Sequence, residues 1–105
     1  MSFVYDNFIQ INNIFPIYIS NHEIAWHLKD ANAVLNWLNN NNKILLGGDI
    51  IDLNKNYTYD NWYYNYDNSL SFVDNVNNSI DKARSYISDY INKNGDCYYV
   101  VLVLR

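Results

Sequence analysis

The residues best suited to chemistry in this chain are two adjacent glycines, scattered carboxylates, two histidines and one cysteine. Gly47 and Gly48 could cradle a phosphate, but a phosphate-binding loop needs a following Lys and a hydroxyl residue, which "LLGGDIIDL" lacks. Glycines inside a strand usually mark a bulge or the close approach of another group. We therefore expect both glycines to be structural, with a large aromatic side chain such as Trp62 filling the space above them.

The histidines, the cysteine and the carboxylates do not match a known catalytic arrangement. His22 and His27 are not spaced to share one face of a helix, and they fit no zinc-binding pattern. Cys97 opens an apolar stretch and is expected to pack rather than react. Asp49 and Asp60 form a candidate carboxylate pair, but such groups are more often surface charges than acid and base. The sequence therefore predicts no catalytic residues, no metal site and no cofactor.

The composition is that of one small, acidic domain. The chain has 105 residues, of which 50% are hydrophobic and 17% aromatic, so it is too apolar to be disordered and fits a single domain over residues 1–105. Its formal net charge of −4 argues against general nucleic-acid binding and suits attraction of a basic partner. A single cysteine excludes an internal disulfide. Because the first twenty residues lack Lys and Arg and contain Pro16, we expect a cytoplasmic protein without a signal peptide or membrane span.

Hydrophobic periodicity predicts which elements must position these residues. Residues 2–11 have the apolar spacing of a short helix, with Phe3 or Val4, Phe8 and Ile11 on one side. Residues 29–42 predict a second helix with a buried stripe of Ala31, Val34, Leu35 and Leu38. Residues 43–53 and 57–66 predict an antiparallel hairpin joined by residues 54–56. A long helix follows from Ser69, with Gly95 as a left-handed cap at its end. Its predicted apolar stripe consists of Phe72 or Val73, Val76, Ile80, Ala83, Ile87 and Ile91.

The chain is predicted to end in an interior strand over residues 97–104, which are apolar on both faces. The expected fold is therefore α+β, with a small, mostly antiparallel three-stranded sheet packed with about three helices. The expected order is helix, helix, strand, strand, helix, strand. Residues 21–28, "NHEIAWHL", have no clear pattern.

The strand over residues 57–66 combines aromatic side chains with carboxylates. Alternation places one set, namely Trp62, Tyr64 and Tyr66, on one face and a second set, namely Tyr59, Asn61, Tyr63 and Asn65, on the other. Tyr and Trp are enriched at binding interfaces, although these side chains could also simply cover a small sheet. The residues predicted to bind a partner are Asp49, Asp52, Asp60, Trp62, Tyr63, Tyr64, Tyr66 and Asp67.

Several short segments together point to a family. They are Leu46-Gly47-Gly48-Asp49, Tyr59-Asp60-Asn61-Trp62-Tyr63, Ala83 to Ile87 and Tyr98 to Leu104. With these segments the chain resembles the immunity protein 40 family of bacterial polymorphic toxin systems, with residues 26–38 also similar. The first twenty residues match least, and residues 21–28 depart from the family pattern.

The resemblance implies a non-enzymatic protein that binds a cognate toxin domain in the cytoplasm of the producing cell. Such a protein occludes the toxin's active site or locks its conformation. The family is linked to several toxin types, so it does not name the target; the acidic charge makes a basic nuclease an attractive one. Gly47, Gly48 and Asn61 are then expected to be structural.

Two other functions remain open at this stage. Asp49, Asp60 and His27 could line a pocket beside the glycines in a small enzyme or ligand-binding domain. The tyrosine-bearing face could instead be buried in a homodimer. A convergent polar pocket would favour the first alternative, and a flat aromatic surface would favour the inhibitor.

Overall fold

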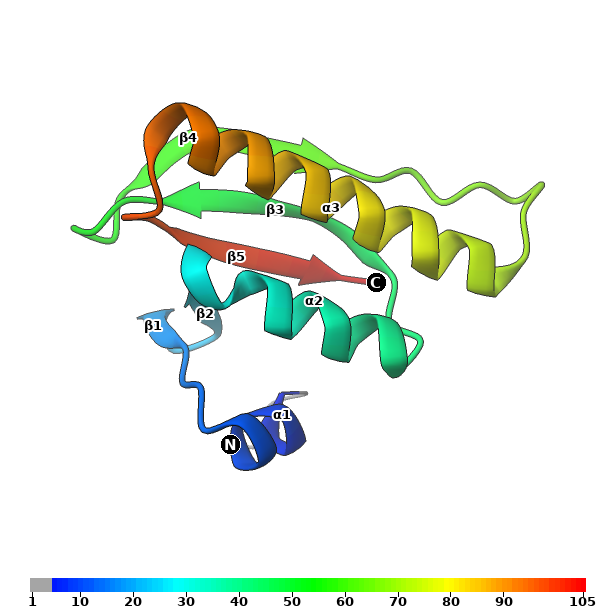
Figure 1. The fold of residues 1–105 in the computed structure, drawn as a ribbon, viewed down its shortest axis with the longest axis horizontal. Helices are drawn as coiled ribbons and strands as arrows, with labels where there is room; N and C mark the ends of the chain where they lie inside the picture. The colour runs from blue at the N-terminus through cyan, green and yellow to red at the C-terminus, as the bar shows by residue number, and fades with distance from the viewer. Residues whose placement is uncertain (1–4) are drawn as a thin grey trace.

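The computed structural model describes residues 5–105, which form helices on a five-stranded sheet (Figure 1). The elements in chain order are α1 (Asp6–Asn12), β1 (Ile17–Ser20), β2 (Glu23–His27), a short 3₁₀ helix η1 (Leu28–Asp30), α2 (Ala31–Asn40), β3 (Leu45–Ile51), β4 (Tyr57–Tyr63), α3 (Phe72–Asn94) and β5 (Tyr99–Leu104). The strand order in the sheet is β1-β2-β5-β3-β4, and every neighbouring pair is antiparallel. None of the helices in this part of the chain is long and apolar enough to cross a membrane.

Within residues 5–105, helices cover one face of the sheet and leave the other face without them. Figure 1 shows α2 and α3 side by side in front of the sheet, and we call this the helix side. Ile50 and Val100 point to the helix side and belong to the main core. Their neighbours Ile51 and Val101 point the other way and form a small second cluster with Ala25. We call this second surface the open face; Ile17 and Ile19 of β1 pack against its cluster.

The α+β class is confirmed, but the predicted three-stranded sheet and its order of elements are wrong. The two missed strands are β1 and β2, which form a hairpin in which Ile17 pairs with Ala25 and Tyr18 with Ile24. These strands are only four and five residues long, so alternation is hard to detect in them. Pro16 also suggested a loop, whereas β1 begins directly after it, where a missing N–H costs no ladder hydrogen bond.

The two longer helices follow their predicted apolar stripes closely. The expected stripe of α2 is entirely buried. In α3, the Ser71 hydroxyl caps the first turn by accepting from the Asp74 N–H, and the helix ends at Gly95, whose φ is +84°. The ψ of Gly95 is 177°, so the positive φ was predicted correctly while the left-handed cap was not. Phe72, predicted as one possible start of the stripe, is half exposed in the first turn.

Three further expectations concern the two ends of the chain. Residues 6–12 are helical, as predicted, and Phe8 is fully buried, but Ile11, which was predicted to share its apolar side, is exposed. Phe3 and Val4 lie outside the described residues. Cys97 is exposed and precedes β5, so the prediction that it packs in a strand is wrong.

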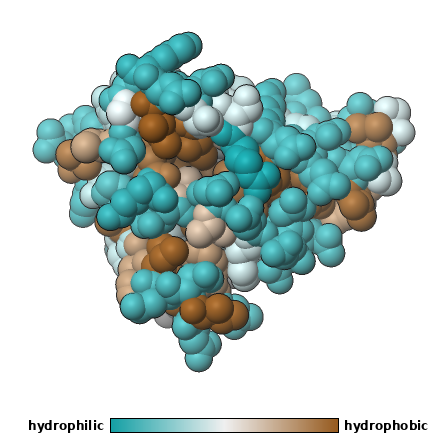
Figure 2. Space-filling model, viewed as in Figure 1, coloured by the Kyte–Doolittle hydropathy of each residue, from teal (hydrophilic) through white to brown (hydrophobic). Residues whose placement is uncertain are grey.

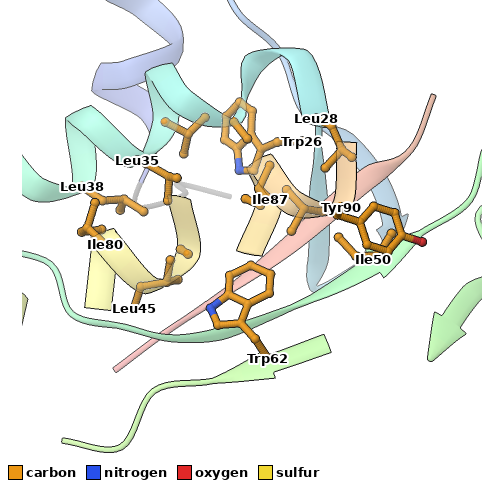
Figure 3. Packing of buried hydrophobic residues seen from close by; sticks show 14 of the residues in the cluster. Trp26, Leu28, Leu35, Leu38, Leu45, Ile50, Trp62, Ile80, Ile87 and Tyr90 are labelled. Atoms are coloured by element: carbon orange, nitrogen blue, oxygen red, sulfur yellow. The ribbon is translucent and has the colours of Figure 1, made fainter. Parts of the chain in front are cut away.

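The main core joins the helix side of the sheet to α2, α3 and α1. Trp26 of β2 meets Phe8 of α1 edge to face, with ring centroids 5.3 Å apart. Trp62 of β4 points toward α3 and lies below Ile87, as Figure 3 shows. The Trp62 ring stacks on Tyr86 with centroids 4.9 Å apart, and its indole N–H has no hydrogen-bond partner among the described residues. Packing alone therefore holds Trp62 in place.

The two glycines make room for this tryptophan, as predicted. Gly48 pairs with Trp62 across the hairpin, and a Cβ at Gly48 would lie 2.3 Å from a Trp62 ring carbon. A Cβ at Gly47 would lie 2.2 Å from the Trp62 carbonyl oxygen, and Gly47 has a φ of +155°. Gly48 thus admits the tryptophan ring, and Gly47 admits its backbone.

Replacing Gly48 with alanine should lower the free energy of unfolding by about 1–3 kcal/mol, because the added methyl group would overlap the Trp62 ring. In a Trp62→Leu background, part of this loss should disappear, since the smaller side chain leaves space. Gly47→Ala is the matched control, because its clash is with backbone that Trp62→Leu does not remove. Urea unfolding measures all of these variants, and equal rescue of both glycine variants would contradict the assignment.

Candidate functional site

The β3–β4 hairpin separates the predicted partner-binding residues onto both faces of the sheet. Gly48, Ile50 and Trp62 face the helix side, so Asp49 and its cross-strand partner Asn61 face the open side. Trp62 is only 5% exposed. The prediction that Trp62 contacts a partner is therefore wrong, because its side chain is used in the core.

An exposed aromatic ring and a half-buried carboxylate do come together on the open face. Tyr63 pairs with Gly47, which pairs in turn with Val103 of β5, and the next row of the sheet contains Asn61 and Asp49. Tyr63 is 70% exposed. We call Asp49, Asn61, Tyr63 and Val103 the open-face patch. It combines one carboxylate, one amide and a large ring beside Gly47, which has no side chain.

A bulge in β4 presents another tyrosine. Between the pairs Asp49–Asn61 and Ile51–Tyr57, β4 contains two more residues than β3. Tyr59 lies in this bulge with a φ of +69°, which is rare for a bulky residue, and its side chain is 88% exposed. The Thr58 hydroxyl donates to the Ile50 carbonyl at 2.9 Å and so anchors the bulge to β3.

Asp60 lies on the opposite side of the sheet from Asp49. Its carboxylate accepts a hydrogen bond from the Tyr90 hydroxyl at 2.8 Å, and it borders a hollow that is also lined by Tyr86, Asp89 and Lys93. Burial and the hydrogen bond to Asp60 raise the pKa of Tyr90 to about 12. Burial is also the main reason that the pKa of Tyr86 is raised, with the negative charge of Asp60 adding to it.

Two more predicted residues hold the loop between β4 and α3. The side-chain oxygen of Asn75 accepts from the Tyr64 hydroxyl at 2.6 Å and from the Asp67 N–H at 2.8 Å. The Asn75 amide nitrogen donates to the carbonyls of Asp67 and Ser71 at 3.0 and 2.9 Å. The Asp67 carboxylate accepts from the N–H and the hydroxyl of Ser69, which lowers the pKa of Asp67. Tyr64 and Asp67 therefore have structural partners within the chain.

The last two predicted residues also have partners at the ends of the hairpin. One Asp52 carboxylate oxygen accepts from the N–H groups of Asn54 and Asn56, which closes the turn between β3 and β4. The guanidinium carbon of Arg105 lies 4.1 Å from the centre of the Tyr66 ring, a cation–π contact. The eight predicted residues thus form no single patch.

The proposed pocket beside the glycines does not form. Asp49 and Asp60 project from opposite faces of the sheet, so they cannot line one cavity. His27 of β2 packs on Tyr99 of β5 with ring centroids 4.8 Å apart. The expectation that Asp49, Asp60 and His27 converge is therefore wrong.

Sequence reasoning missed two buried polar residues of α3. Asn75 and Ser79 are both 0% exposed. The Ser79 hydroxyl accepts from the Leu45 N–H at 3.1 Å and donates to the Val76 carbonyl at 2.9 Å, which ties the start of β3 to α3. Their position on the apolar stripe was the available signal, because a polar residue on a buried face must find hydrogen-bond partners.

Comparison with protein families gives one match of nearly full length. A profile of the family described as immunity protein 40 matches residues 10–104. The matched region contains the whole sheet, α2 and α3. Comparison with curated proteins and with solved structures gave no match.

Asn75→Ala should lower the free energy of unfolding by about 2–4 kcal/mol, because the substitution leaves several groups around the 64–71 loop without partners. Asn77→Ala, at an exposed position of the same helix, is the control and should change stability by less than about 0.5 kcal/mol. Chemical denaturation measures both variants. Equal stabilities would show that this hydrogen-bond network does not hold the loop.

The free energy of unfolding should fall as pH rises from about 10 to about 12. The reason is that Tyr90 loses its proton near pH 10 when unfolded but holds it to about 12 when folded, so alkaline pH favours the unfolded chain. Tyr90→Phe should make this decline shallower. Urea unfolding at a series of pH values measures it, and an unchanged slope in Tyr90→Phe would assign the decline to other groups.

Proposed function

The chain belongs to the immunity protein 40 family, and from this membership we propose that it binds and neutralises a cognate bacterial toxin domain in the cell that produces both. The match over residues 10–104 is the observation that carries the proposal. The protein acts by occupying the surface of the toxin rather than by transforming a molecule. Because the toxin threatens the producing cell from within, we place the complex in the cytoplasm.

The open-face patch is the surface we propose for contact with the toxin. The helix side is mostly hydrophilic in Figure 2, with hydrophobic surface confined to separate areas, and α3 points charged and amide side chains outward there. The open face instead exposes Tyr63 and Val103 beside the Asp49 carboxylate. Binding energy in interfaces is concentrated in a few aromatic and charged anchors, so Tyr63 and Asp49 are the expected anchors.

The other predicted residues contribute less directly to this proposal. Asp52, Tyr64 and Asp67 bond within the chain, so their substitution would act chiefly through stability. Asp60 lies on the helix side beside Tyr90, and Tyr66 packs against Arg105 beyond the end of β4. A stable inhibitor buries about 800 Å² on each partner, which is more than the patch alone supplies. Tyr59 in the neighbouring bulge would extend the contact.

The charge of the chain favours a basic nuclease domain as the target. The net charge is −4, and carboxylates such as Asp49 can occupy positions that a nuclease reserves for phosphates. Charge complementarity of this kind raises the association rate and weakens with ionic strength. A complex that forms equally fast at low and at high salt would point to a toxin of another class.

Co-expression with the toxin domain encoded beside the chain tests the function. Wild-type protein should restore growth, and the double variant Asp49→Lys/Tyr63→Ala should not, since losing each anchor costs about 2 kcal/mol, or about 30-fold in Kd. Asp89→Lys makes the same charge change at an exposed position of α3 and should still protect. Circular dichroism confirms that each variant folds.

Several results would contradict the proposal. If the wild-type chain neither binds the toxin nor protects the cell, the proposed function is wrong. If the folded double variant protects fully, the open-face patch is not the surface that contacts the toxin. Light scattering that shows a homodimer dissociated by Tyr63→Ala would assign the same patch to self-association.

A further inference from the structure

Strand β2 leaves its neighbour β5 after two residue pairs. Trp26 pairs with Val100 and His27 pairs with Tyr99, and beyond these positions β2 pairs with β1 alone. On its other side, β5 pairs with β3 along its whole length, from Tyr99 to Leu104. Among the strands of residues 5–105, the second half of β5 therefore has a neighbour on one side only.

The direction of the backbone groups shows which ones this leaves open. The Tyr98 carbonyl accepts from the Leu28 N–H on the β2 side, whereas the Arg105 N–H donates to the Ile44 carbonyl on the β3 side. Because backbone groups alternate in direction along a strand, the N–H and C=O of Leu102 and Leu104 point toward the β2 side. The strand pairs formed by residues 5–105 give these groups no partner.

A hollow occupies the space that a continued β2 would have filled. It has a volume of about 330 Å³ and lies between His22, Glu23 and Ile24 on one side and residues 101–104 of β5 on the other. Tyr5 also lines it. We call this hollow the β5 slot. Its wall carries open backbone donors and acceptors, which is the feature that an added strand recognises.

The outer edges of the sheet are protected in ways that the β5 slot is not. β1 is only four residues long, and β4 is interrupted by the bulge at Tyr59. Short edge strands and bulges are the usual devices that prevent strand addition. In the slot, β5 runs as "VLVL" without a charge, a proline or a glycine. This stretch is therefore the best template for strand addition among the described edges.

Resting on the proposed function, we infer that the β5 slot receives an extended segment of the toxin, which pairs with Leu102 and Leu104 as an additional strand. The slot is bordered by β2 and β5, so its occupant must be free on both of its own edges. A second copy of this chain does not meet that condition through β5 or β4, because each is bonded to β3. An extended loop or terminal segment of a partner does meet it.

The slot is also continuous with the open-face patch. Val103 belongs to the patch and lies between Leu102 and Leu104, whose backbone groups border the slot. A toxin segment in the slot would bring the body of the toxin against Tyr63 and Asp49. Backbone pairing would then supply affinity, while the patch would supply selectivity.

Hydrogen exchange of the free protein tests the slot first. The amide of Leu102 should exchange at least about tenfold faster than that of Val101, its neighbour on the same strand, because Val101 faces β3 and Leu102 faces the slot. Adding the toxin domain should slow exchange at Leu102 and Leu104 by about tenfold or more. Slow exchange at Leu102 in the free chain would overturn the inference.

The variant Leu104→Pro tests the pairing itself. Proline removes the N–H that points into the slot and keeps the bonds to β3, while Leu104→Ala is the matched control for the lost side chain. Leu104→Pro should bind the toxin about tenfold more weakly than Leu104→Ala, as measured by titration calorimetry, with both variants folded by circular dichroism.

The possible outcomes separate this inference from the proposed function. Suppose that the wild-type chain binds the toxin and protects the cell, but the toxin does not slow exchange at Leu102 and the two Leu104 variants bind with equal affinity. This result would overturn the role of the slot and leave the proposed function intact. A wild-type chain that neither binds nor protects overturns both. If exchange at Leu102 and Leu104 slows as the protein concentration rises in the absence of toxin, the slot is filled by a second copy of this chain. That result would overturn the inference that a toxin segment occupies it.

Discussion

The packing of Trp62 over Gly48 is the contact on which the rest of the structure depends. A side chain at Gly48 would occupy the position of the tryptophan ring, and a side chain at Gly47 would meet its backbone. The ring in turn stacks on Tyr86, so the edge strand β4 is joined to α3 through an aromatic contact without a hydrogen bond at the indole nitrogen. A small domain has few such contacts to lose, because its net stability is typically only about 5–15 kcal/mol.

This contact also decides which surfaces are available for binding. Turning Trp62 toward α3 turns Tyr63 and Asn61 toward the open face, since neighbouring strand residues point in opposite directions. The main core then lies on the helix side, and the open face has exposed aromatic surface beside Asp49. The proposed contact with a partner uses this division, because residues that hold the core cannot also be given to a partner.

Buried polar groups add a second constraint by joining α3 to the segments around it. Asn75 binds the loop that follows β4, and Ser79 binds the start of β3. The β3–β4 hairpin is therefore tied to α3 both where its first strand begins and where its second strand ends. The N-terminal hairpin is attached in another way, because β2 pairs with β5 at one end and its Glu23 carboxylate accepts a hydrogen bond from the Tyr57 hydroxyl of β4. It pairs with β5 at two positions and then diverges, which leaves the β5 slot as a consequence of how the sheet ends.

Periodicity by itself determined α2, α3, the β3–β4 hairpin and the interior position of β5, because long apolar stripes and alternation directly express burial. The two adjacent glycines inside a predicted strand also indicated a close approach, and Gly48 does admit the Trp62 ring. The short strands β1 and β2 were not predictable, because four or five residues carry too little pattern and their stability comes from neighbours distant in sequence. Only the tertiary structure decided that Trp62 is core, that Asp49 and Asp60 lie on opposite faces, and that β2 leaves β5 open. The reason is that facing and strand pairing depend on which layer covers each side of the sheet, and local sequence does not specify that.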